Sequence, residues 1–180
     1  MKKVFLSLLL LVVAAGLTAA TAPRVSRGTL AAMEKSLDQT ISGLWKDNQY
    51  LLLGSTRGVY LEGYGAVFTA EVNLVANPIS LMNTRLSPPD IARFRQTKLE
   101  RVAVLKKTLT ESLGSTAASL DTVPAEEKVT IVAFLDHFPW EDMTGVPVQV
   151  TIEGQKKTLV EAQRSPAGRS LDSVVRVTEN

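Results

Sequence analysis

The chain has no cysteine and only one histidine among its 180 residues. The lack of cysteine excludes disulfides, thiolate metal sites and a cysteine nucleophile, so packing alone must hold the fold together. With His137 as the only histidine, a catalytic zinc site, which usually takes two or three His or Cys ligands, is not indicated. The G-x-S-x-G and S-x-x-K patterns of common serine hydrolases are also missing.

An excess of one charge is missing too. The chain carries 20 Lys and Arg against 18 Asp and Glu, and removal of Lys2 and Lys3 with a leader leaves 18 against 18. A neutral chain without interleaved basic and aromatic residues argues against nucleic acid as a partner. No apolar run after residue 22 is long enough to span a bilayer, so we predict no transmembrane segment in the mature chain.

The N-terminus has the three parts of a secretory signal peptide. Residues 1–3 are positively charged, 4–15 are apolar apart from one serine, and 16–22 are rich in small residues. We predict cleavage after Ala20 or Ala22, the second site being disfavoured by the rigid Pro23 that follows it. Residues 1–22 are therefore the predicted leader, and 23–180 form one domain located in the periplasm or secreted.

Helical periodicity is clear in two segments and weaker in a third. Apolar residues recur at helical spacing over 29–43, and Ser87 followed by two prolines predicts the start of a long helix over 88–120. Residues 155–163 favour a short helix, with a hairpin return through Gly154 as the alternative.

Alternating and apolar runs predict the strands. The segment 66–74 alternates strictly and pairs with 59–62 through a loop at 63–65, whereas 129–135 is apolar on both sides and should be a central strand. The remaining strand candidates are 50–53, 146–152 and an edge strand at 174–178. We therefore predict a two-layer α/β sandwich, with a mixed sheet of about five strands packed by the N-terminal helix and the long central helix.

The loop after the central strand holds the candidate catalytic residues, Asp136, His137 and Glu141. A histidine beside carboxylates at a strand end can act as a general base, although no nucleophile is paired with it in the sequence. The alternative is an acidic surface loop whose aromatic residues fold onto the core. A metal site through these residues and Asp142 lacks the ligand types or the spacing of zinc and calcium sites, and we predict no cofactor.

The candidate binding residues are Arg95, Lys98, Tyr64, Glu71 and Trp140. Arg95 and Lys98 fall inside the apolar stripe of the long helix. They either extend past the core to solvent, pair with Glu62 or Glu71, or line a groove for an anionic ligand together with Tyr64. A further set of residues is interpreted as turn glycines: Gly54, Gly58, Gly63 and Gly65.

Three stretches carry a resemblance to other proteins: 58–72 (GVYLEGYGAVFTAEV), the helix segment 98–101 (KLER) and 140–162, which begins WED. Together they resemble a group of uncharacterised exported proteins of environmental bacteria. The resemblance implies export and a single domain, and it implies no reaction or ligand.

Three functional hypotheses remain open at this point. The first is a non-enzymatic periplasmic or secreted module that binds a ligand or another envelope protein. The second is a small hydrolase or other enzyme that uses the 136–142 loop with His137. The third is a carrier of a small anionic ligand.

Overall fold

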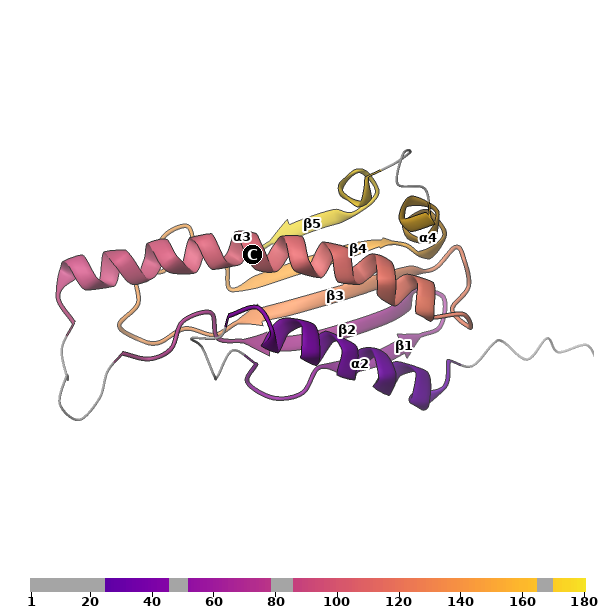
Figure 1. Ribbon diagram of the computed structural model, residues 1–180, viewed down its shortest axis with the longest axis horizontal. Helices are drawn as coiled ribbons and strands as arrows, with labels where there is room; N and C mark the ends of the chain where they lie inside the picture. Colours follow the sequence, from indigo (N-terminus) through magenta and orange to yellow (C-terminus); the bar gives the residue numbers. More distant parts are fainter. Residues whose placement is uncertain (1–24, 46–51, 79–85, 165–169) are drawn as a thin grey trace, which may run out of the picture.

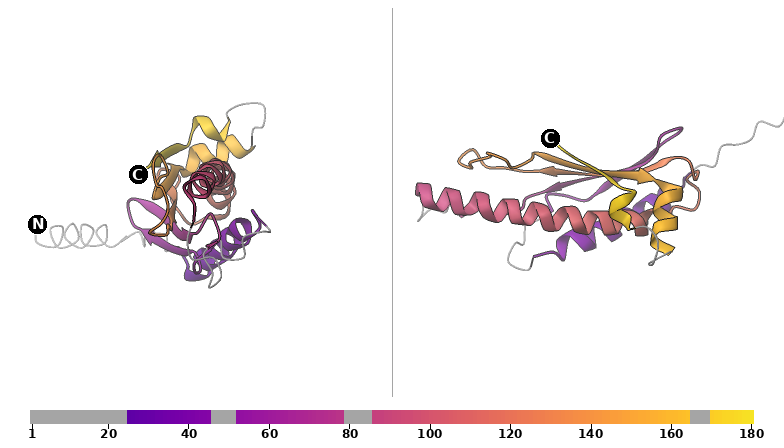
Figure 2. Two further views of the ribbon diagram at one scale, coloured as in Figure 1. Left: turned by 90° about the vertical axis from the view of Figure 1, so that its left-hand side faces the viewer. Right: turned by 90° about the horizontal axis from the view of Figure 1, so that it is seen from above.

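The computed structural model describes residues 25–45, 52–78, 86–164 and 170–180. They form a five-stranded sheet in the order β1-β2-β3-β4-β5, with the helices on one of its faces (Figures 1 and 2). The strands are β1 (Arg57–Leu61), β2 (Gly65–Val72), β3 (Lys128–Leu135), β4 (Gln149–Gln155) and β5 (Arg176–Glu179). The helices are α2 (Arg27–Ser42), α3 (Pro88–Ser119), α4 (Lys156–Arg164) and the short 3-10 turn η1 (Leu171–Ser173). The predicted two-layer sandwich is confirmed.

The sheet is mixed because of one crossover. β2 and β3 are parallel, and every other neighbouring pair is antiparallel. Parallel neighbours need a long connection, which α3 provides as it crosses the covered face of the sheet (Figure 1). The carboxyl ends of β2 and β3 therefore meet at the same end of the sheet.

The helix α3 begins and ends as the sequence predicts. The Ser87 side chain caps its N-terminus, two prolines follow, and the helix continues through Gly114 to Ser119. Its apolar stripe, which includes Val102, Leu105, Leu109 and Leu113, is buried against the sheet. This stripe, α2 and the covered side of the strands make a single core.

The free edge of β1 is capped by side chains of α2. Glu34 accepts a hydrogen bond from the Gly58 amide at 2.6 Å, and Arg27 donates to the Gly58 carbonyl at 3.0 Å. Asp38 accepts from the Thr56 amide at 2.8 Å. Gly58 is therefore not a turn residue, as interpreted from the sequence, but a strand residue; a Cβ there would come within 2.6 Å of the Phe68 ring.

The prediction that 129–135 is a central strand is confirmed, because β3 is the third of the five strands. The strand is central and one side is buried, but on the other side Phe134 is 43% exposed and Val132 is half-buried. The reason is that none of the described helices packs against that side of the sheet (Figure 2). We call it the open face.

Several boundaries differ from the predicted ones by a few residues. The β1–β2 loop is 62–64 rather than 63–65, because Gly65 already pairs with Leu61. The strand predicted at 146–152 is β4, which begins later, at Gln149. In the candidate strand 50–53, residues 50 and 51 lie outside the described residues and Leu52 makes only an isolated bridge to Val72. The short helix and the edge strand are confirmed as α4 and β5.

The predicted leader, residues 1–22, lies outside the described residues. Among the helices that are described, none combines the length and apolar character needed to cross a membrane.

Candidate functional site

The open face has two halves with different electrostatics. At the amino ends of β2 and β3 the charges are paired: Lys128 bonds Glu153 at 3.2 Å, and its ammonium lies 5.6 Å from the centre of the Tyr64 ring. The Tyr64 hydroxyl also lies 3.3 Å from both the Thr130 hydroxyl and Glu153. In this half of the open face, the charged and polar side chains therefore have partners within the protein.

The other half, at the carboxyl ends of β2 and β3, contains two adjoining hollows. The first is about 250 Å³ and the second about 230 Å³. They share three lining residues, Leu53, Glu71 and Phe134, so we treat them as one groove. The first hollow is also lined by Gly54, Ser55, Arg57, Thr69 and Ala70, and the second by Leu135, Asp136, His137 and Val148.

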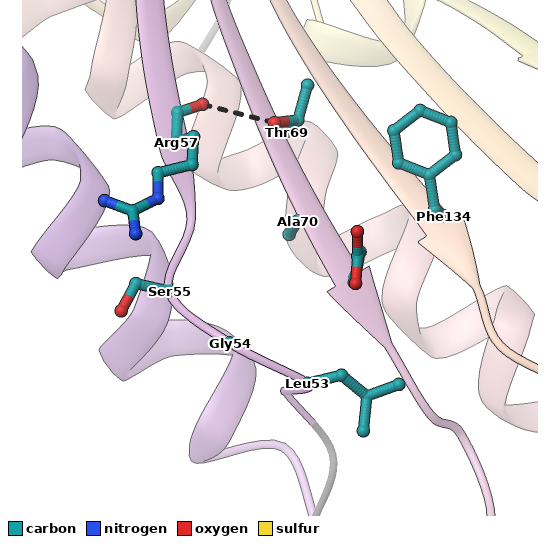
Figure 3. A pocket seen from close by; sticks show the side chains of 8 residues that line it. Leu53, Gly54, Ser55, Arg57, Thr69, Ala70 and Phe134 are labelled. Carbon is teal, nitrogen blue, oxygen red and sulfur yellow. Dashed lines mark hydrogen bonds between the residues drawn. The ribbon is translucent and has the colours of Figure 1, made fainter.

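Strand register explains how the groove forms. Glu71 of β2 is directly beside Phe134 of β3, and Thr69 is directly beside Arg57 of β1, all on the open face. The segment before β1 turns across the end of β2, where the Leu53 amide donates to the Glu71 carbonyl at 2.9 Å. Figure 3 shows Arg57 and Phe134 on opposite sides of β2, with Leu53 near its end.

The two charges of the first hollow are not paired. Arg57 and Glu71 are diagonal neighbours on β1 and β2, a relation that places Cα atoms roughly 7–8 Å apart, within reach of long side chains. Nevertheless, neither side chain makes an ion pair or hydrogen bond with any other residue in the described part of the chain. The Arg57 head instead turns to the outer side of β1 (Figure 3), where its positive charge acts on the Glu34 carboxylate of α2.

Three of the residues singled out in the sequence meet in the second hollow: Asp136, His137 and Glu71. His137 is exposed, and its ring has no hydrogen-bond partner within the ranges that the structure describes. It is therefore not held in the orientation that a general base needs. The one serine among the lining residues of the groove, Ser55, lines the other hollow.

The third catalytic candidate, Glu141, is turned away from the groove. Its carboxylate pairs with Lys98, and the two side chains are 4% and 1% exposed. Lys98 also donates to the Asp136 carbonyl at 2.7 Å, and Glu141 accepts from the Phe138 amide at 3.2 Å. These contacts bind the 136–142 loop to α3, so Glu141 has a structural role.

Arg95 and Trp140 belong to the same helix–loop contact. Arg95 bonds Asp142 at 3.0 Å. The Trp140 ring stacks on Phe138 at 5.6 Å and meets the Phe94 ring edge-on at 5.5 Å. Hydrogen bonds from Thr144, with a smaller contribution from the Arg95 charge, lower the pKa of Asp142 below its ordinary 3.8.

The structure corrects the predicted environment of Arg95 and Lys98. Their partners are Asp142 and Glu141, not Glu62 or Glu71, and Lys98 does not extend to solvent. Tyr64 packs at the opposite end of β3, about 25 Å away at 3.3 Å per strand residue. The three residues therefore do not form a common groove for an anion. In addition, the described residues contain no group of three or more His, Asp or Glu placed to hold a metal ion.

Sequence reasoning missed Leu53, Arg57 and Phe134 as site residues. Arg57 was assigned to a turn, and Phe134 was identified only as part of a central strand that is apolar on both sides. The one available signal was the alternation of 66–74, which places Thr69 and Glu71 on a polar face.

Comparisons with known proteins give no parallel for this arrangement: no protein-family model, no curated protein and no solved structure matches the chain.

Proposed function

We propose that the protein is an exported, non-enzymatic binding module that takes up a small ligand or part of an envelope protein on the open face of its sheet. The observation that carries this proposal is the groove, where exposed apolar side chains lie beside two opposite charges that make no ion pair or hydrogen bond in the described part of the chain. Leaving such charges and apolar surface free is more typical of a binding site than of a face kept only for solubility. Export rests on the three-part leader at residues 1–22.

The rival function is an enzyme that uses His137. It is favoured by one observation, the presence of His137, Asp136 and Glu71 in the same hollow. It is disfavoured because the ring lacks an orienting hydrogen bond and no Ser or Thr hydroxyl in the described residues bonds to it.

Export is tested by producing the full chain in a bacterial host and fractionating the cells. We expect the protein in the periplasm or medium, with a mature N-terminus at Thr21 or Pro23. The full chain with its leader intact in the cytosol would contradict export.

Binding and catalysis are separated with the purified mature protein. Native mass spectrometry of protein isolated from the periplasm should detect a retained small ligand. If the partner is an envelope protein, affinity capture should isolate it as a stable complex. Turnover of substrates in a broad hydrolase panel, abolished by His137→Ala, would replace the binding module with the enzyme.

A further inference from the structure

We propose that the groove binds an apolar α-amino acid zwitterion, either as a free amino acid or as a short apolar peptide with both ends charged. This inference rests on the proposed binding function and names the ligand class of the same site. It is carried by the charges of the groove, its apolar walls and its size.

The charges have the order that a zwitterion requires. Glu71 offers a carboxylate to a ligand ammonium, and Arg57, one diagonal step away on the same face, offers a guanidinium to a ligand carboxylate. Neither side chain makes an ion pair or hydrogen bond among the described residues, so ligand binding breaks none, and the turn of Arg57 into the groove gives up only its longer-range attraction to Glu34. The exposed Arg57 side chain turns over Thr69 to meet the carboxylate, a rotamer change that exposed side chains make rapidly.

The walls select an apolar side chain. Phe134 and Leu53 stand on two sides of Glu71 and are 43% and 42% exposed, so both have apolar surface left to bury. Val148 extends the same surface into the second hollow and is 47% exposed. Burial of this surface by a ligand side chain is favourable at about 25 cal/mol per Å².

The volume limits the ligand to a small one. The first hollow, at about 250 Å³, is smaller than the roughly 300–1,000 Å³ of drug-sized sites. A single amino acid fits the first hollow. A dipeptide reaches the second, where its ammonium also meets the Asp136 carboxylate.

Calorimetry on the mature protein tests the proposal with four probes: L-leucine, L-leucyl-L-leucine, N-acetyl-L-leucine and L-leucinamide. We expect leucine or dileucine to bind and the two blocked compounds to bind about tenfold or more weakly, because each has lost one charge-assisted contact. Tighter binding of leucine identifies the free amino acid as the ligand, and tighter binding of dileucine identifies the peptide.

Variants then assign the contacts. Glu71→Gln should weaken the binding of leucine about tenfold or more, and N-acetylation should then cause no further loss of affinity. Arg57→Gln should weaken leucine binding equally, and amidation should then cause no further loss. Phe134→Ala should lower the affinity for all four probes by a similar factor. Arg176→Gln, on the same face but outside the groove, should leave binding unchanged, and circular dichroism checks that each variant is folded.

The proposal is overturned if neither leucine nor dileucine binds, or if blocking the charges has no effect. A retained ligand of another class, found by native mass spectrometry, would overturn the amino acid proposal alone and leave the binding module in place. Substrate turnover that depends on His137 would overturn the binding module itself.

Discussion

The Lys98 side chain extends from α3 to the 136–142 loop and has almost no access to solvent. Burial of an ammonium is costly unless a counter-charge and hydrogen bonds replace the lost water. Glu141 and the Asp136 carbonyl provide them, and the Phe138 amide satisfies the second Glu141 oxygen. The pair thereby holds the end of β3, from which Asp136 and His137 project into the groove.

We predict that Lys98→Met lowers the free energy of unfolding by about 3 kcal/mol or more, because it leaves the Glu141 carboxylate buried without its partner. The double variant Lys98→Met with Glu141→Leu should recover part of this loss, since the uncompensated charge is then gone. Urea denaturation of the three proteins measures both effects. Lys106→Met is the control, because its pair with Glu179 is partly exposed and should contribute little; an equal loss there would contradict the role of burial.

A second residue-scale prediction concerns Gly65, which joins the β1–β2 loop to β2. Its φ is 132°, and a Cβ there would lie 1.9 Å from the Lys128 carbonyl oxygen, a backbone atom of the neighbouring strand. Gly65→Ala should therefore cost about 3 kcal/mol or more, or prevent folding. Gly63→Ala is the matched control: its φ is 79° but nothing lies within 4 Å, so only backbone strain of about 1 kcal/mol is added. Thermal unfolding that ranks the two equally would contradict this account.

At the scale of elements, the contact between α2 and β1 is an electrostatic one. Burial alone would raise the pKa of Glu34, but the hydrogen bonds from Arg27 and the Gly58 amide, with the charges of Arg27 and Arg57, outweigh it and lower the pKa below the ordinary 4.5. A carboxyl with a depressed folded pKa stabilises the protein above its unfolded pKa and loses that contribution as the pH falls through the folded value.

We therefore predict that the wild-type protein loses stability more steeply than Glu34→Gln as the pH falls below about 4.5. At pH 7 the variant should be less stable, because the Gly58 amide and Arg27 lose their charged acceptor. Urea denaturation between pH 7 and pH 3 measures the difference. Parallel curves for the two proteins would mean that Glu34 has the same pKa folded and unfolded.

The elements themselves and the polar side of β2 were predictable from the sequence, whereas the exposed side of β3 was not. The α3 segment has a Ser-Pro-Pro start and a long apolar stripe, and 66–74 alternates strictly, so local patterns determine both. Whether Phe134 is covered depends on the face of the sheet against which the helices pack, and β3 is apolar on both sides. No local pattern decides that.

The candidate site was predictable only in part for the same reason. Glu71 and His137 were identified as isolated residues, one on a polar strand face and one after a strand. Their meeting in one hollow follows from the parallel pairing of β2 and β3, and the wall formed by Leu53 follows from a segment that turns back across β2. Both are long-range contacts that residue spacing does not encode.

At the scale of the whole molecule, the sheet has two edges that are protected differently. An open edge invites pairing with another chain, and proteins limit this with caps, charges or short strands. The β1 edge is capped by Glu34, Arg27 and Asp38 of α2. The other edge is β5, only four residues long and exposed at every position. It lies beside β4, seven residues long and alternately buried.

The protective role of β5 leads to a prediction for a chain that ends at Val175. Removal of 176–180 frees the β4 edge and the Val148 and Gln149 amides, which now donate to the Asn180 carbonyl at 2.7 and 3.2 Å. We expect the truncated protein to unfold at lower urea and to self-associate, since β4 is long and regular enough to pair with a second copy. Sedimentation velocity over a concentration series measures the association. The control variant Thr178→Lys keeps β5 and should stay monomeric. If the truncated chain also stays monomeric, the β4 edge does not need β5 to prevent self-association.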